Sequence, residues 1–218
     1  MLAAPVFQDK FHRYKNGILI AVLIILHLVG VIGLSIETYR ESFLTLSFIN
    51  LAISFSILIL ARKKHTIFYF SIVVFTFFLG MAAEWIGVHS SFLFGDYYYG
   101  ENLGFKWHGV PIIIGVNWVM LTIISAAVAC RFNLNKYTQA LLAAFLMLFL
   151  DVLIEPFAII SDYWYWNGEI PISNFVTWFL VALVLQIAWF HFNLAEKNKV
   201  AFSLYLIQVV FFVVLNIV

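Results

Sequence analysis

Residues 137–160 read YTQALLAAFLMLFLDVLIEPFAII, an apolar run whose only acidic side chains fall in its second half. A helix needs about 20 apolar residues to cross the roughly 30 Å of hydrocarbon in a bilayer, and this run is long enough. Six similar runs divide the rest of the chain, at residues 17–36, 43–61, 66–88, 110–130, 172–194 and 199–217. The sequence therefore predicts an all-α fold, a polytopic integral membrane bundle of about seven transmembrane helices.

The composition agrees with a membrane protein. Of the 218 residues, 64% are hydrophobic and only 11% are charged, and a soluble domain could not cover its surface with so few charges. The predicted helices occupy nearly the whole chain, so we expect one transmembrane domain over residues 1–218. The formal net charge of +1 gives no reason to expect a nucleic-acid partner, and the single cysteine, Cys130, excludes an internal disulfide.

The basic residues are distributed unequally between the two ends of the predicted helices. Most of the 12 Lys and Arg residues fall at the N-terminus or in alternate connections: Lys10, Arg13, Lys15, Arg62, Lys63, Lys64, Arg131, Lys136, Lys197 and Lys199. The positive-inside rule therefore predicts a cytoplasmic N-terminus and a multi-pass protein of the cell membrane, the inner membrane of a bacterium. The basic N-terminal segment resembles that of a signal peptide. Residues 17–36 are nevertheless too long for a signal-peptide core and lack a small-residue cleavage site after them.

The two longest connections, residues 89–109 and 161–171, face outside in this topology and are rich in aromatic residues. They contain FLFGDYYYG at 92–100 and DYWYWNG at 162–168. An aromatic belt at the level of the lipid headgroups would account for some of these rings. It would not explain why the rings are confined to two connections on one side, so we expect some of them to serve a site.

Residues 80–118 and 151–178 share an order of features that indicates a weak internal repeat. In each stretch, an acidic residue near the outer end of one predicted helix precedes an aromatic connection and a proline that opens the next helix. A tryptophan, Trp118 or Trp178, follows the proline by seven residues. Both units run through the membrane in the same direction, as in a parallel repeat.

Three acidic residues lie within the predicted spans, where ionisable side chains are costly and usually serve a function. Glu84 sits near the outer end of its span, whereas Asp151 and Glu155 lie four residues apart and so project from one helix face. Two carboxyl groups in a low-dielectric setting cannot easily both ionise, so at least one is expected to stay neutral and able to give a proton to a weak base. The alternative is that these acids only form hydrogen bonds between helices.

The other polar residues in the spans are weaker candidates. His27, in the first span, is more typical of a helix–helix hydrogen bond than of a site. Asn117 and Asn174 lie at depths similar to those of the acids. Because no His-x-x-x-His or Glu-x-x-His spacing occurs, we expect no metal site, and no motif indicates a cofactor.

Two blocks of the sequence resemble a known family. The first is SFLFGDYYY at residues 91–99, followed by GVP at 109–111; the second is DVLIEP at 151–156, with WYW at 164–166 and IPISNF at 170–175. Together they are similar to the conserved blocks of the bacterial and archaeal carotenoid-biosynthesis membrane proteins, the CruF-type carotenoid 1,2-hydratases. The resemblance covers roughly residues 80–180.

The resemblance implies that water is added across the terminal double bond of an acyclic carotenoid, giving a tertiary alcohol. A membrane carboxylic acid suits such a protonation, and aromatic rings stabilise the resulting cation. Asp151 or Glu155 is then expected to donate the proton, while the other and Glu84 position water. The remaining expected site residues contact substrate or water: Trp118, Trp164, Trp166, Trp178, Asn117, Asn174, Tyr97 and Asp96. The expected partners are a lipophilic carotenoid, water and membrane lipid, with other enzymes of the pathway as further candidates.

Two other functions are compatible with these residues. The same protonation followed by ring closure would make the protein a carotenoid cyclase. A carotenoid-binding or transport protein would use the acids along a translocation path, but such a path should also have polar residues in the inner half of the spans. There the sequence offers mainly Gln186 and Gln208.

Overall fold

The computed structural model describes the backbone of residues 4–218 and the side chains of residues 14–218, so the side chains of Lys10 and Arg13 lie outside the described residues. Eight helices account for most of the chain. They are α1 (Ala4–Ser35), α2 (Glu37–Thr45), α3 (Ser47–Ala61), α4 (Ile67–Ser90), α5 (Ile112–Ala129), α6 (Lys136–Ile160), α7 (Ile172–His191) and α8 (Lys199–Leu215).

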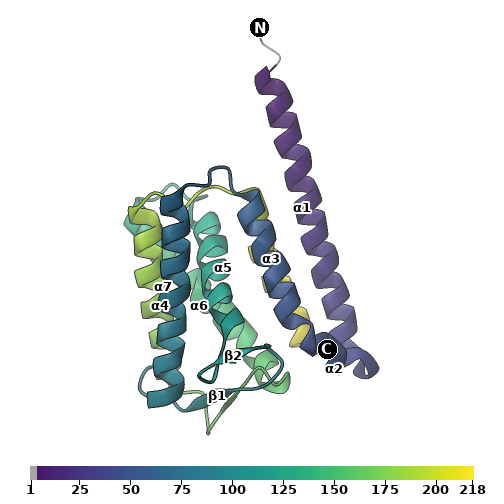
Figure 1. Cartoon of the computed structure of the whole chain (residues 1–218), viewed down its shortest axis with the longest axis vertical. Helices are drawn as coiled ribbons and strands as arrows, with labels where there is room; N and C mark the ends of the chain where they lie inside the picture. The colour runs from purple at the N-terminus through teal and green to yellow at the C-terminus, as the bar shows by residue number, and fades with distance from the viewer. Residues whose placement is uncertain (1–3) are drawn as a thin grey trace.

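These helices confirm the predicted all-α polytopic membrane fold. Five of them, α1, α4, α5, α6 and α7, are long and apolar enough to cross a membrane, and α2 with α3 would form a sixth crossing. The apolar α8 is shorter and corresponds to the last predicted run. Figure 1 shows the first turn of α1 at one end of the molecule and the C-terminus near the opposite end, as expected for an odd number of crossings.

The predicted span 43–61 is not one continuous helix. Helix α2 ends at Thr45 and α3 begins at Ser47, with a bend of 55° between them. The hydroxyl of Thr45 donates to the carbonyl oxygen of Glu41 at 3.0 Å, and that of Ser47 donates to the carbonyl oxygen of Phe43 at 3.3 Å. Such bonds to the preceding turn compete with the backbone ladder and bend helices.

Helix α5 is the centre of the bundle. Of its residues 72% are buried, against 22% for the span of α1, which packs at the periphery along α8. Trp118, Met120, Leu121 and Ile124 of α5 are fully buried. The connections after α4 and α6 meet near one end of this bundle (Figure 1).

Short strands tie the two aromatic connections together, which the prediction of two separate loops did not include. Strand β1 (Tyr97–Tyr99) pairs antiparallel with β4 (Trp164–Trp166), in a register that sets Tyr97 opposite Trp166 and Tyr99 opposite Trp164. Strands β2 (Lys106–Trp107) and β3 (Val110–Pro111) form a second small pair before α5. The two connections thus act as one structural unit.

Candidate active site

The ends of α4, α5, α6 and α7 nearest β1 and β4 enclose a small cavity. Its volume is about 30 Å³, enough for water but not for an isoprenoid end group unless the walls move. The three predicted acids all line it. The full lining is Glu84, Phe94, Tyr97, Tyr99, Ile114, Asn117, Asp151, Ile154, Glu155, Trp164, Trp166, Asn174 and Trp178.

Glu84 of α4 accepts three hydrogen bonds from aromatic side chains. The hydroxyls of Tyr97 and Tyr99 donate to its Oε2 at 2.6 and 2.8 Å, and the indole Nε1 of Trp118 donates to its Oε1 at 3.0 Å. Only 2% of Glu84 is exposed. Both oxygens of this carboxyl group are therefore engaged, and together they hold the side chains of Tyr97, Tyr99 and Trp118.

The period of a strand explains how β1 reaches Glu84. Alternate residues of a strand point to opposite faces, so Tyr97 and Tyr99 are buried while Tyr98 between them is exposed. Burial, and next the negative charge of Glu84, raise the pKa of both Tyr97 and Tyr99 well above the ordinary value for tyrosine. Both hydroxyls therefore keep their protons at neutral pH and remain donors.

Glu155 of α6 has a similar arrangement with β4. The indole Nε1 groups of Trp164 and Trp166 both donate to Glu155 Oε1, the first at 2.9 Å. These two tryptophans are alternate residues of their strand, as the two tyrosines are in β1. Strands β1 and β4 therefore each present two aromatic donors to the glutamate on the helix that precedes the strand.

Helices α5 and α7 both begin after a proline, and a tryptophan of each meets that of the other in the core. Pro111 is the N-cap of α5 and Pro171 that of α7. Seven residues after these prolines, about two helical turns into each helix, Trp118 and Trp178 stack with ring centroids 3.9 Å apart and an interplanar angle of 14°. Trp178 lines the cavity, whereas Trp118 lies behind it and connects the stack to Glu84.

Asp151 differs from the two glutamates. It is 2% exposed, and its Oδ2 atom has no hydrogen-bond partner among the described residues. The Nδ2 atom of Asn174, also in the cavity wall, is likewise unpaired among these residues. A buried, unpartnered polar atom is costly, so both are poised to bind water or a reacting group in the cavity.

Asp96 and His27 lie away from this cavity, and the predicted site residue Trp118 does not line it. Asp96 is exposed in the first connection, where its Oδ2 accepts a hydrogen bond from Asn167 Nδ2 at 3.0 Å. It therefore holds the two connections together. His27 is buried between α1 and α8, where its Nδ1 lies 2.9 Å from the carbonyl oxygen of Leu23, and it lines a different cavity.

Several residues of the cavity were not anticipated. Tyr99 could have been found from the two-residue period of β1, but three consecutive tyrosines hide that period. Phe94, Ile114 and Ile154 carry no polar group that distinguishes them from core residues, and only the fold brings them to the cavity.

Comparison with known proteins adds one finding. A protein-family model described as "Carotenoid biosynthesis protein" matches residues 39–218, which include every residue of the cavity and exclude α1. No curated protein and no solved structure matches the chain.

Proposed function

Because the chain belongs to the carotenoid biosynthesis protein family, we propose that it is a carotenoid hydratase, which adds water across the terminal double bond of an acyclic carotenoid. The substrate is then a lipophilic polyene that enters from the bilayer, and the product is a tertiary alcohol. We further propose that the protein resides in a bacterial inner membrane with its N-terminus in the cytoplasm.

The observation that carries this proposal is the buried, unpartnered Oδ2 atom of Asp151 beside aromatic rings. Protonation of an unactivated alkene needs an acid that is neutral and shielded from water. Glu84 accepts three hydrogen bonds and Glu155 accepts two, so both are engaged in holding aromatic side chains, whereas Asp151 accepts none from the described residues. Asp151 is therefore the proton donor in our proposal.

The reaction has two steps. The π electrons of the terminal double bond take the proton from Asp151, forming a C–H bond and leaving a tertiary carbocation. A water molecule in the cavity then attacks the cation through its oxygen, and its surplus proton returns to the Asp151 carboxylate. The sum is the addition of one water, and the acid is restored without a cofactor.

The aromatic wall suits the carbocation. The faces of Trp and Tyr rings attract cations by about 0.5–2 kcal/mol each, with the higher values in desolvated sites. In our proposal Trp178, Trp164 and Trp166 face the cation, and Trp118 supports Trp178 from behind through their stack. Tyr97 lies against Trp166, with ring centroids 5.2 Å apart, and limits the movement of that indole.

In our proposal the water molecule is oriented by the polar side chains of the cavity other than Asp151. The Nδ2 atom of Asn174, which has no partner among the described residues, and the amide of Asn117 are suited to hold a water oxygen, and Glu155 accepts a hydrogen bond from that water. We assign Glu84 to holding Tyr97, Tyr99 and Trp118 in place rather than to binding water, because its two oxygens already accept three hydrogen bonds.

We also propose that residues 80–118 and 151–178 form an internal repeat. Comparison of the two units again indicates Asp151 as the proton donor. Glu84 then corresponds to Glu155, since each accepts two donors from the strand that follows it. The position four residues earlier is Asp151 in the second unit and Gly80 in the first. Gly80 packs directly against Trp118, so the first unit has no room for an acid there. The second unit alone supplies the proton donor.

The direct test is to express the chain in a bacterial host that accumulates lycopene and to analyse the extracted pigments by mass spectrometry. We expect a product heavier by the mass of one water. An isomer of unchanged mass would show cyclisation instead. Unaltered lycopene that co-purifies with the protein would favour a binding or transport role.

The stacked tryptophans give a second test. Replacing Trp178 by leucine removes the ring face nearest the cavity, so we expect a loss in hydration rate of about tenfold, equivalent to about 1.4 kcal/mol in the barrier. Trp178→Phe retains an aromatic face and should lose less. Rates in membranes containing equal amounts of each variant check this order, and equal rates for Trp178→Leu and the parent would contradict it.

A further inference from the structure

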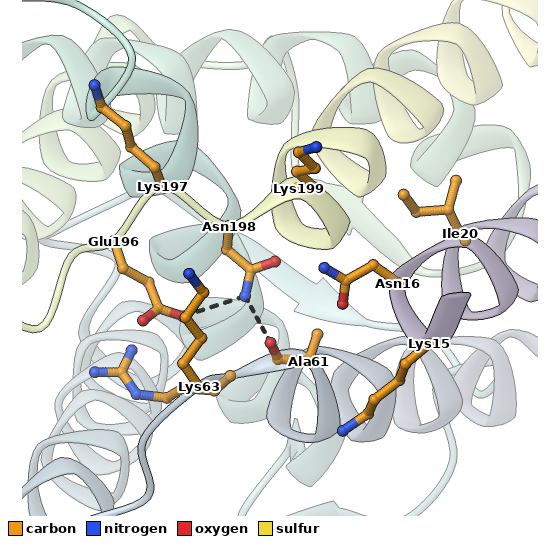
Figure 2. A pocket seen from close by; sticks show the side chains of 11 residues that line it. Lys15, Asn16, Ile20, Ala61, Lys63, Glu196, Lys197, Asn198 and Lys199 are labelled. Carbon is orange, nitrogen blue, oxygen red and sulfur yellow. Dashed lines mark hydrogen bonds between the residues drawn. The ribbon is translucent and has the colours of Figure 1, made fainter. Parts of the chain in front are cut away.

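A second cavity, of about 500 Å³, opens at the opposite end of the bundle from the candidate active site. It lies between residues 15–20 of α1, the end of α3 and the connection that leads into α8 (Figure 2). The residues at its α1 wall include Gly17 and Ile20, where the apolar run of that helix begins. The cavity therefore sits at the depth of the lipid headgroups.

The lining of this cavity is strongly basic. It contains Lys15, Arg62, Lys63, Lys197 and Lys199, against the single carboxylate of Glu196. No salt bridge joins any of these six among the side chains that the structure describes. Lys63, Lys197 and Lys199 are also exposed, so their ammonium groups are available to an anion.

The walls of the cavity are held by specific hydrogen bonds. Asn198 Nδ2 donates to the carbonyl oxygen of Ala61 at 3.1 Å, and Arg62 Nη1 donates to that of Leu194 at 2.9 Å. Lys15 Nζ donates to the carbonyl oxygen of Leu60 at 2.9 Å, which joins α1 to α3. Figure 2 shows the amide of Asn16 on α1 facing that of Asn198 across the cavity.

The general preference for basic residues on the cytoplasmic side does not account for this gathering. Two other basic residues of the same end lie outside the cavity and pack on aromatic rings. The guanidinium of Arg131 lies 3.7 Å from the ring centroid of Phe202, and Lys136 Nζ lies 5.2 Å from that of Tyr137. Arg62 of the cavity also packs on a ring, with its guanidinium 3.9 Å from the ring centroid of Tyr69. Lys63 and Lys199, by contrast, contact neither a ring nor a carboxylate among the side chains that the structure describes.

We propose that this cavity binds the phosphate-bearing headgroup of an anionic membrane phospholipid. Basic pockets between transmembrane helices on the cytoplasmic side suit such headgroups. An apolar cavity of about 230 Å³ lies deeper between α1 and α8, where its lining includes Ile24 of α1 and Leu206 of α8. It offers a path for an acyl chain below the headgroup, which a soluble phosphate compound would not use.

This inference does not depend on the proposed hydration. Part of the site comes from α1, which lies outside the residues matched by the family. The bound lipid would fill the space between α1, α3 and α8 and so fasten the peripheral first helix to the bundle.

The test measures which lipids remain on the full-length protein after purification in detergent from membranes that contain phosphatidylglycerol and phosphatidylethanolamine. We expect phosphatidylglycerol to be enriched on the parent protein. The double variant Lys63→Gln/Lys199→Gln should retain about tenfold less of it. Gly17→Phe should lower retention similarly without changing charge, because Gly17 lines the cavity and a Cβ atom added there meets no atom within 4 Å.

The matched control is Lys64→Gln/Lys136→Gln, which removes the same charge from the same end of the bundle but outside the cavity. It should retain phosphatidylglycerol like the parent. Equal loss in this control and in the cavity variant, or no enrichment on the parent, would overturn the proposal. Displacement of the lipid by millimolar glycerol phosphate alone would overturn the assignment to a lipid and point to a soluble phosphate compound.

Discussion

Replacing Asp151 by asparagine is expected to lower carotenoid hydration by about 10²–10⁴-fold, the range typical of losing a general acid. Asparagine has nearly the shape of aspartic acid and stays neutral, so packing around this buried position is preserved. It has no acidic proton for the alkene. The rate of product formation, normalised to the amount of folded protein in the membrane, checks the prediction.

Two further variants make this result specific. Asp96→Asn is the same change in the exposed first connection, outside the cavity, and should keep activity close to that of the parent. Glu155→Gln retains an oxygen that accepts from both indoles and should reduce the rate by less than Asp151→Asn does. An Asp151→Asn protein that hydrates within tenfold of the parent would remove Asp151 as the donor, and a greater loss in Glu155→Gln would transfer the role to Glu155.

The membrane fold could be predicted from the sequence because the length of an apolar run is a strong and local signal. Each predicted apolar run overlaps a helix of the structure, and the boundaries differ by only a few residues in most cases. There are two exceptions. Helix α1 begins at Ala4, well before the predicted start at residue 17, and in residues 43–61 hydropathy alone cannot detect the bend at Leu46. The hydroxyls of Thr45 and Ser47 bond to the preceding turn, but Ser56 and Ser71 do the same within continuous helices, so no local pattern marks the bend.

The residues of the cavity could be predicted only in part, because the cavity is assembled from contacts between residues that are distant in the chain. The spacing of Asp151 and Glu155 places both on one face of α6, and both line the cavity. The donors to Glu84 come from as far away as Trp118, and nothing local to Glu84 predicts that partner. Pairing of β1 with β4 is equally hidden, since three-residue strands in separate connections lack a distinct pattern of their own.

The contrast between the three acids is the main result of the geometry. Glu84 and Glu155 each organise two aromatic residues of a neighbouring strand, and the two strands pair with one another. The acids therefore help to build the aromatic wall, whereas Asp151 stands within it without a partner among the described residues. From sequence alone the three carboxyl groups could not be distinguished in this way.

Replacing Glu84 by alanine is expected to cause the largest loss of stability among single substitutions at the site. It leaves the hydroxyls of Tyr97 and Tyr99 and the indole of Trp118 buried without their acceptor. Each unsatisfied buried donor costs about 1–3 kcal/mol, so the summed effect is several kcal/mol. For a chain of this length, we expect the apparent unfolding temperature in detergent to fall by about 10 °C or more.

Two further variants test whether the loss of stability comes from the hydrogen bonds of Glu84 rather than from the removal of an acidic residue. Glu84→Gln keeps an oxygen acceptor for Trp118 and an amide that can donate to a tyrosine hydroxyl, so it should lose less stability than Glu84→Ala. Glu101→Ala removes an acid at the same end of the bundle whose side chain is 86% exposed in its salt bridge with Lys106. Because exposed ion pairs contribute about 0–1 kcal/mol, that variant should unfold near the temperature of the parent. If Glu84→Ala also unfolded there, the three donors would have to find other partners, and Glu84 could not be the residue that holds the aromatic wall in place.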